Sequence, residues 1–419
     1  MFVFFDIIFT VYFILYFPVL LLRGKWHKGF LERFGFFRPD ITQTLARGEN
    51  LWLHAVSVGE VAAIDGVVAG LRARFPSGRI VLTVTTKTGY SFAQRKYHGI
   101  ATVLWSPLDL SITVDSFVRV IRPVVYVAAE TELWPNLFAR LSVDKVPILV
   151  LNGRISDQAF PRYRRVKWLL KKTLERVAVF GMQSELDAGR VIALGAASRN
   201  VRVIGNLKFD NVPDAVVADP KEYGCAPGQM VLLGGSTHDG EEQLLINVFL
   251  AERGLFPGLC LILAPRHPER SLAVAELVRQ AGLKPFLFSK RNGVMNSGEV
   301  MVVDTIGHLP WFYSLATVVF VGKSLTAQGG HNIIEPAMFG KPVITGPYMQ
   351  NFRDISKAFC AEKAVIQVVD AQGLGQAVHR LLADPMLRTE FGERARMVIY
   401  RNRGATQRAV DMIAGMVRE

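Results

Sequence analysis

Residues 329–336, with the sequence Gly-Gly-His-Asn-Ile-Ile-Glu-Pro, are the part of the chain best suited to hold a ligand. The two glycines carry no side chains, so a ligand can approach backbone N–H groups at a helix start, which attract negative charge. Asn332 and Glu335 are three residues apart and would share one helix face, while Ile333 and Ile334 would turn toward the core. A carboxylate there also complements the helix dipole, so a structural role for Glu335 stays open.

Charged side chains follow apolar runs in the first half of the chain as well. They are Glu60, the pair Glu130 and Glu132, and Lys208. A carboxylate at the mouth of a cleft can act as a general base, whereas one in the first turn of a helix can simply complement the dipole. A lysine at a domain junction can contact an anionic substrate or form a hinge salt bridge. Both interpretations apply to Glu60 and Lys208.

The second half of the chain carries three further polar segments. Residues 234–242 form a small-residue turn into a capped helix, which suits phosphate. Arg266 follows an apolar run, where a guanidinium can grip phosphate or carboxylate through two hydrogen bonds. Residues 306–308 precede a short amphipathic helix and can frame a base or ribose. Histidines on these loops lack zinc-ligand spacing, which favours structural or hydrogen-bonding roles for His238, His267, His308 and His331.

These loops require elements that bring them to one edge of a sheet. Short apolar runs alternate with helical patterns, and the predicted strands are 51–56, 80–85, 102–105, 124–129, 148–151, 178–181, 201–204, 231–235, 259–264, 300–303, 318–321, 343–345 and 365–368. Alternation of this kind predicts parallel sheets with helices on both faces. Open sheets of this class bind nucleotides at the carboxyl ends of their strands, where the polar segments lie.

The fold class that follows is α/β, with two Rossmann-like domains, a cleft between them and an N-terminal membrane-anchor helix. A chain of 419 residues is too long for one ordinary domain. A polar stretch with three prolines marks a linker. The predicted boundaries are 1–22 for the anchor, 23–210 for the N-terminal domain, 211–228 for the linker and 229–419 for the C-terminal domain.

The N-terminal segment, 2–22, is almost continuously apolar and long enough to cross a bilayer. A basic and aromatic flank follows it, which predicts that everything beyond the anchor is cytoplasmic. A cleaved signal peptide would carry its charges before the apolar run. Asp6 and Pro18 leave open a second possibility, a helix that lies in the membrane plane.

The charge composition of the chain indicates which kinds of molecule it binds. The net charge of +13 and the isoelectric point near 9.7 favour anionic partners, and no signature of a nucleic-acid-binding module is present. Basic and apolar residues interleave over 162–172, which suits an anionic membrane surface, although a solvated helix face would look similar. Three widely spaced cysteines suggest neither disulfides nor zinc.

Five segments together resemble the 3-deoxy-D-manno-oct-2-ulosonic acid (Kdo) transferases of lipopolysaccharide biosynthesis. They are Ser-Val-Gly-Glu at 57–60, Glu-Thr-Glu-Leu-Trp-Pro-Asn at 130–136, Gly-Asn-Leu-Lys-Phe-Asp at 205–210, Pro-Arg-His-Pro at 265–268 and the segment 329–336. The resemblance covers the whole chain and implies a GT-B-type glycosyltransferase at the inner membrane. The implied reaction transfers Kdo from CMP-Kdo to the phosphorylated disaccharide of the lipid A precursor, through an acceptor-binding N-terminal domain.

The resemblance also implies a role for each matching residue. Glu60 would be the general base, and Glu130 and Lys208 would support the transition state. The CMP site would comprise Arg266, His267, Ile306, Gly307, His308, Asn332, Ile333, Ile334 and Glu335. The chain departs from the family at position 308, where histidine stands in place of the expected glutamate.

Neither a cofactor nor a metal is expected, because the relevant loops lack an Asp-x-Asp-type motif. Two other classes fit the same pattern. A membrane-associated GT-B enzyme that uses a UDP-sugar would share the fold and the Glu335-type ribose contact. A non-catalytic nucleotide-binding membrane protein would keep the glycine loops without needing Glu60 or Lys208.

Overall fold

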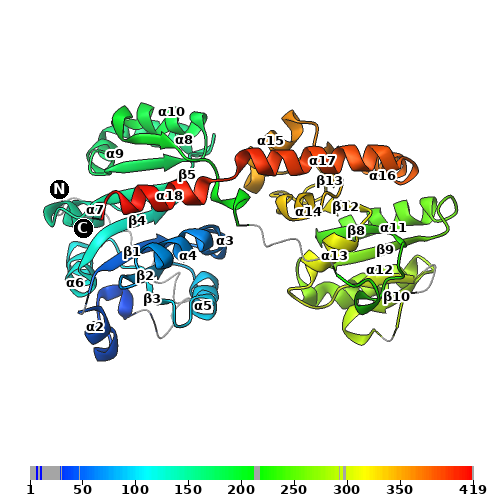
Figure 1. Cartoon of the computed structure of the whole chain (residues 1–419), viewed down its shortest axis with the longest axis horizontal. Coiled ribbons are helices and arrows are strands. Elements are labelled where there is room, and N and C mark those ends of the chain that lie inside the picture. The colour runs from blue at the N-terminus through cyan, green and yellow to red at the C-terminus, as the bar shows by residue number, and fades with distance from the viewer. Residues whose placement is uncertain are drawn as a thin grey trace. The chain divides into compact units, whose positions relative to one another are not determined.

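The computed structural model describes residues 6–7, 10–11, 29, 31–46, 48–211, 218–291, 293–295 and 299–417. The chain divides into two compact units, shown in Figure 1. The first comprises Met1–Asn211 together with Asn402–Glu419, and the second comprises Val212–Arg401.

The described part of the first unit holds a seven-stranded sheet in the order β3-β2-β1-β4-β5-β6-β7. Every strand pairs in parallel with its neighbours. The strands are β1 (Asn50–Ala55), β2 (Arg79–Val84), β3 (Ala101–Trp105), β4 (Pro123–Ala129), β5 (Ile148–Gly153), β6 (Val179–Met182) and β7 (Val201–Val203). The predicted strands of this half are confirmed to within one or two residues.

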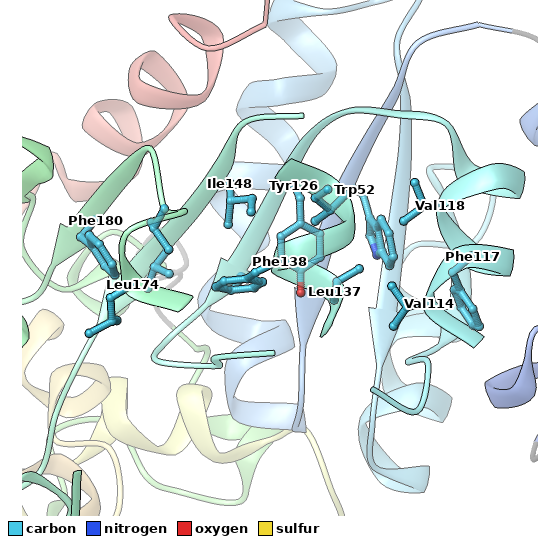
Figure 2. Close-up of a cluster of buried hydrophobic side chains, with 14 of the residues drawn as sticks. Trp52, Val114, Phe117, Val118, Tyr126, Leu137, Phe138, Ile148, Leu174 and Phe180 are labelled. Carbon is cyan, nitrogen blue, oxygen red and sulfur yellow. The ribbon is translucent and has the colours of Figure 1, made fainter. Parts of the chain in front are cut away.

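Two hydrophobic cores cover the two faces of this sheet. Alternate residues of β1 divide between them, because Trp52 belongs to one core while Leu51 and Leu53 belong to the other. The first core, drawn in Figure 2, also takes Phe117 from α6 (Ser111–Ile121) and Phe138 from α7 (Pro135–Val143). Burial on both faces explains why these strands read as continuous apolar runs.

The remaining helices of the first unit are short. They are η2 (Glu32–Phe34), α2 (Pro39–Leu45), α3 (Val58–Ala63), α4 (Asp65–Arg74), α5 (Lys87–Lys96), α8 (Ala159–Arg165), α9 (Lys167–Leu174), α10 (Glu185–Leu194), η3 (Ser198–Asn200), η4 (Leu207–Phe209) and α18 (Ala405–Ala414). The pattern over 61–75 predicts one helix, but the structure has two, with Ile64 between them outside the helical region (φ −86°, ψ 5°).

The second unit repeats the architecture with the strand order β10-β11-β9-β8-β12-β13-β14, again all parallel in its described residues. Its strands are β8 (Met230–Thr237), β9 (Leu259–Pro265), β10 (Lys284–Leu287), β11 (Glu299–Val302), β12 (Val318–Val321), β13 (Val343–Thr345) and β14 (Ile366–Gln367). Strand β10 was not predicted, because it is an edge strand that contains Pro285 and is too short and too exposed to show an apolar run.

The helices of the second unit complete the doubly wound fold. They are η5 (Lys221–Tyr223), α11 (Glu241–Glu252), η6 (Pro268–Arg270), α12 (Ser271–Gln280), η7 (Phe288–Lys290), α13 (Leu309–Leu315), α14 (Ile334–Met338), η8 (Gln350–Phe352), α15 (Arg353–Ala361), α16 (Ala371–Ala383) and α17 (Pro385–Asn402). Cys225 and Cys260 are buried and Cys360 is exposed, and all three are free.

The end of the chain corrects the predicted boundary of the C-terminal domain, 229–419. Helix α18 packs Ala405, Ala409 and Ile413 into a core of the first unit, and Figure 1 shows it beside the first unit's blue and cyan elements. Asp210 fixes the start of that helix by accepting hydrogen bonds from Gly404 N–H and Thr406 N–H at 2.7 and 2.6 Å. The last helix joins the first unit because its apolar residues are buried in that unit's core, and the order of elements along the chain does not show this.

The predicted linker, 211–228, also differs from the structure at its second end. Ala218 N–H donates to Ser314 Oγ at 3.1 Å, and Cys225 is buried, so 218–228 pack as part of the second unit.

Most of the predicted anchor, 1–22, and its basic flank lie outside the described residues. Asp6 is described, and its carboxylate accepts hydrogen bonds from Ser111 N–H at 2.8 Å and from Asn136 Nδ2 at 2.9 Å. Across the described ranges, no helix combines the length and the apolar character that crossing a bilayer requires.

Candidate functional site

The first unit places Glu60 and Glu130 at the point where the strand order of its sheet reverses. Strand β1 pairs with β2 on one side and β4 on the other, and open α/β sheets usually bind their ligands at the carboxyl ends of strands at such a point. Glu60 follows β1 and Glu130 follows β4. The structure therefore brings together two predicted residues that lie 70 positions apart.

Glu60 is held by its own chain. Its Oε2 accepts a hydrogen bond from Val56 N–H at 2.7 Å, and its Oε1 accepts one from the Ser57 hydroxyl at 3.1 Å. Ser57 is the N-cap of α3, and its Oγ accepts from Glu60 N–H at 3.4 Å. This reciprocal arrangement resembles a capping box, which fixes the carboxylate whatever else it does.

Glu130 stands in a backbone conformation that non-glycine residues rarely adopt, with a φ of 57°. Conformations of this kind cluster at functional sites, where surrounding contacts must maintain them. Glu130 N–H donates to Leu151 O at 2.8 Å, and the next residue, Thr131, accepts from Arg154 N–H at 2.9 Å. The loops after β4 and β5 are thus joined at their bases.

Lys208 reaches the same region through the loop after β7. Asn152, which has a φ of 56°, accepts from Leu207 N–H at 3.1 Å through its Oδ1. Asn206 caps the turn by accepting from Lys208 N–H at 3.0 Å, and its Nδ2 donates to Gln183 Oε1 at 2.9 Å. These side-chain hydrogen bonds connect the loop after β7 to the ends of β5 and β6, although β6 separates β5 from β7 in the sheet.

Burial and mutual charge perturb the ionisation of this cluster. Burial raises the pKa of Glu60 to about 7; the Val56 N–H bond opposes that shift, while the charges of Glu130 and Glu132 add to it. Burial and Glu130 likewise raise the pKa of Glu132. Burial lowers the pKa of Lys208, whereas the nearby Glu130 carboxylate raises it. The helix start therefore does not keep Glu60 fully ionised at neutral pH.

The second unit has a cavity of about 430 Å³ at the carboxyl ends of β8, β9 and β11. Its lining includes Arg266 and His267 after β9, Ile306 and Gly307 after β11, and Ser236 from β8. Four of the residues predicted to bind CMP therefore line a single cavity. Arg266 N–H donates to Thr237 O at 3.0 Å, which ties the loop of Arg266 to β8.

Glu335 and Asn332 are paired, as their spacing predicts. Asn332 Nδ2 donates to Glu335 Oε1 at 3.0 Å, and Asn332 Oδ1 accepts from Ile334 N–H at 3.1 Å. Burial raises the pKa of Glu335, while Asn332 and the Arg266 charge lower it. Ile333 and Ile334 are completely buried, so their predicted contact with CMP stays a prediction.

The predicted contact between His308 and CMP stays a prediction. Among the described residues, those that line the cavity include its neighbours Gly307 and Leu309 but not His308 itself. The His308 ring lies 5.0 Å from the Phe288 ring and 6.1 Å from the Tyr223 ring, between centroids. At this position the side chain packs against an aromatic cluster.

The other three histidines of the predicted loops, His238, His267 and His331, lie close together, and His267 lines the cavity. His238 Nε2 and His331 Nε2 lie 3.1 Å apart within hydrogen-bonding distance, and the His267 ring centroid is 5.8 Å from that of His238. Burial, then the Arg266 charge, lowers the pKa of His331 to about 3. The hydrogen-bonding interpretation of His238 and His331 is confirmed. No three His, Cys, Asp or Glu side chains within the described ranges are grouped to hold a metal ion.

Lys323 is a further residue of this region that was not predicted from the sequence, and its charge lowers the pKa values of both His238 and His331. Its only sequence signal is its place two residues beyond the end of β12. Glu241 lies in the segment 234–242, whose turn into a capped helix was predicted to suit phosphate, and the structure buries this residue completely.

The sequence of this chain is similar to those of known proteins. Residues 28–211 match the family model for "3-Deoxy-D-manno-octulosonic-acid transferase (kdotransferase)", and residues 294–398 match "Glycosyl transferases group 1". The 3-deoxy-D-manno-octulosonic acid transferase of Haemophilus influenzae is 30% identical over 93% of this chain and 91% of its own length. The protein of the same name from Bordetella pertussis is 31% identical over 93% and 92%.

Solved structures agree on the fold. A glycosyltransferase from Rickettsia africae superposes with a TM-score of 0.58 at 12% identity, covering 89% of this chain and all of that one. The two parallel-sheet units are therefore those of GT-B-type glycosyltransferases, as predicted. With sequence relatives of this identity along nearly its whole length, the chain belongs to the 3-deoxy-D-manno-octulosonic acid (Kdo) transferase family.

Proposed function

We propose that this protein transfers Kdo from CMP-Kdo to a sugar hydroxyl of the lipid A precursor, lipid IVA, with Glu60 as the general base. The observation that carries the proposal is the cluster at the carboxyl ends of β1 and β4. There, Glu60 has a pKa of about 7 and lies within electrostatic range of Glu130 and Lys208. A base with a pKa near the working pH can accept a proton efficiently and release it again.

Each step of the proposed reaction has a residue to support it. The acceptor oxygen forms a bond to the anomeric carbon of Kdo as its proton passes to Glu60. The bond from that carbon to the phosphate oxygen breaks, and CMP leaves with the electron pair. Lys208 can stabilise negative charge that develops near the reacting centre. Arg266 can hold the departing phosphate through charge-assisted hydrogen bonds, while Glu335 accepts from the ribose hydroxyls.

The proposed location is the cytoplasmic face of the inner membrane, with residues 1–22 attaching the chain to it. The contacts of Asp6 with Ser111 and Asn136 favour the alternative in which this segment lies in the membrane plane. Support comes from α8 and α9, where six exposed basic residues surround Trp168, which is 71% exposed. The six are Arg162, Arg164, Arg165, Lys167, Lys171 and Lys172. An exposed aromatic ring among cations fits the boundary between anionic headgroups and acyl chains.

The test is turnover of a Glu60→Gln variant, followed by mass spectrometry of the lipid product. Glutamine keeps the size of the side chain and an oxygen to accept from Val56, but it cannot take the proton. We expect transfer at saturating CMP-Kdo to fall by about 10²–10⁴-fold. CMP affinity should be unchanged.

Glu185→Gln is the matched control. Glu185 is also in the first turn of a helix of the first unit, behind the capping serine Ser184, and it is exposed. A folded Glu60→Gln protein with near-normal turnover would refute the assignment of the base. Tighter binding of UDP than of CMP to the unmodified protein would favour the UDP-sugar alternative.

A further inference from the structure

The second unit has its own switch point, where the strand order reverses between β8 and β12. Crevices of this kind in open α/β sheets usually receive the ligand, and the backbone N–H groups around them often bind its phosphate. Here a carboxylate of the protein occupies the position. Glu241 is the first residue of α11, follows β8 after a short turn and is completely buried.

Each of the two carboxylate oxygens of Glu241 accepts two hydrogen bonds from backbone N–H groups. Oε2 accepts from His238 N–H at 2.9 Å and from Lys323 N–H at 2.8 Å. Oε1 accepts from Ser324 N–H at 2.9 Å and from Leu325 N–H at 3.1 Å. Three consecutive N–H groups after β12 thus converge on one side chain, as they would on a bound anion.

The two loops that meet on Glu241 are both in unusual conformations. Ser236 and Lys323 have left-handed backbones, with φ values of 54° and 57°. Gly322 has no room for a side chain, because a Cβ there would lie 2.4 Å from Ser236 O and 2.7 Å from Glu241 Oε2. Conformations of this kind persist only where other contacts impose them, and the four bonds to Glu241 supply such contacts.

Both loops lead directly to the candidate donor site. Ser236 lines the Arg266 cavity, and Thr237 O accepts from Arg266 N–H. On the other side, Lys323 O accepts from Gly330 N–H at 2.7 Å, and residue 330 begins the turn that carries Asn332 and Glu335. The contacts therefore form a continuous path from Glu241 to both segments that are proposed to hold the nucleotide, the one with Arg266 and the one with Asn332 and Glu335.

The neighbouring carboxylate has a different set of partners. Glu242 is also completely buried, but its Oε1 accepts from Thr237 Oγ1 at 2.9 Å and from Arg270 Nη1 at 2.7 Å. Neither bond reaches the loop after β12. Glu242 is consequently a matched control for a buried carboxylate at the start of α11.

We propose that Glu241 is a positioning residue that takes the place of a bound anion at the switch point of the second sheet and fixes the two loops of the donor site. The N–H groups of 323–325 are then already occupied, and the phosphate of the donor is directed to the Arg266 cavity. The consequence for CMP rests on the proposed function, whereas the fixing of the loops does not.

The first measurement is hydrogen exchange of the intact protein without nucleotide. A Glu241→Gln side chain turns an NH₂ group toward two of the four N–H donors, so those bonds are lost. We expect exchange at 323–325 to accelerate at least about tenfold, because each open amide loses its protecting acceptor. Glu242→Gln should leave exchange at 323–325 as in the unmodified protein. Equal protection of these amides in all three proteins would overturn the proposal.

The second measurement is CMP binding by calorimetry. Glu241→Gln should weaken CMP by about 10- to 100-fold through displaced loops, and Glu242→Gln should weaken it less. Unmodified protein that fails to bind CMP would contradict the proposed function while leaving the exchange result to decide the role of Glu241. If hydrogen exchange at 323–325 is faster in Glu241→Gln but its CMP affinity is normal, Glu241 does not position the donor site.

Chemical rescue separates anion replacement from ordinary packing. Glu241→Ala leaves the four N–H groups around an empty space that formate can enter. Formate should restore protection at 323–325, and chloride at equal ionic strength should not. Should the alanine variant fail to fold without formate, refolding that depends on formate gives the same answer. Recovery with neither anion, or equally with both, would count against the anion-replacement role.

Discussion

Val56 N–H donates a 2.7 Å hydrogen bond to Glu60 Oε2, which holds the carboxylate at the carboxyl end of β1. That bond favours the ionised form of Glu60, yet burial and two neighbouring carboxylates outweigh it and leave the pKa at about 7. The balance makes Glu60 responsive to pH in the physiological range. Two predictions depend on it.

The first concerns the pH dependence of transfer. A general base works only when deprotonated, so kcat/KM should rise with pH through a midpoint near 7. Glu132→Gln removes one of the charges that raise this pKa, so its profile should move to lower pH. The measurement is initial rate with CMP-Kdo and lipid acceptor from pH 5.5 to 8.5. A flat profile across that range would exclude Glu60 as the titrating base.

The second prediction concerns stability. Because the pKa of Glu60 is raised from 4.5 to about 7, the folded protein holds this proton more tightly than the unfolded chain does. The contribution of Glu60 to the free energy of unfolding should therefore decline as pH rises from about 4.5 to about 7. Melting temperatures of Glu60→Gln relative to unmodified protein should improve between pH 5 and pH 8. A difference that does not vary with pH, or that worsens, would contradict the raised pKa.

A third prediction addresses the nucleotide site. Glu335→Gln should weaken CMP by about 1–3 kcal/mol, the cost of losing a hydrogen bond to a charged group. Glu276→Gln, at an exposed carboxylate on α12 that pairs with Arg279, should leave CMP affinity unchanged. Isothermal titration calorimetry measures the CMP affinity of both variants. If the two affinities are equal, Glu335 does not contribute to CMP binding.

A fourth prediction addresses the membrane surface. Trp168 should enter the headgroup region of anionic vesicles, so brominated phosphatidylglycerol should quench its fluorescence. Trp168→Phe should reduce that quenching to the part contributed by Trp26 in the predicted flank of the anchor, and Trp311→Phe should leave it unchanged, because Trp311 is partly buried in the second unit. The attraction should weaken in high salt. Quenching that Trp168→Phe does not reduce would point to another contact surface.

The fifth prediction concerns Asp6. Its carboxylate satisfies the first N–H group of α6 and the side chain of Asn136, so Asp6→Ala should destabilise the first unit by about 0.5–2 kcal/mol. Asp40→Ala should cost much less, since Asp40 is exposed and pairs only with the exposed Arg38 among described contacts. Urea unfolding of the detergent-purified protein measures both. Equal midpoints for the two variants would mean that the Asp6 contact contributes nothing.

The sequence by itself determined the class of fold and the residues worth examining. Strands buried on both faces must be apolar throughout, so all thirteen predicted runs lie within two residues of observed strands at each end, and 365–368 extends one residue beyond β14 at both ends. Charged residues that follow apolar runs are visible in the sequence, so Glu60, Glu130, Lys208 and Arg266 could be singled out from the sequence alone. Local signals of this kind depend on neighbours along the chain.

Only the tertiary structure decided what depends on distant partners. Helix α18 joins the first unit because its apolar face completes a core built from residues 1–211. The pKa of Glu60 rises because burial and the loop after β4 act on it, and His308 turns to Phe288 in place of the cavity. Glu241 looks like any helix-start carboxylate until Lys323, 82 residues away, donates its N–H to it. Charge and burial at these positions come from packing, which spacing along the chain does not encode.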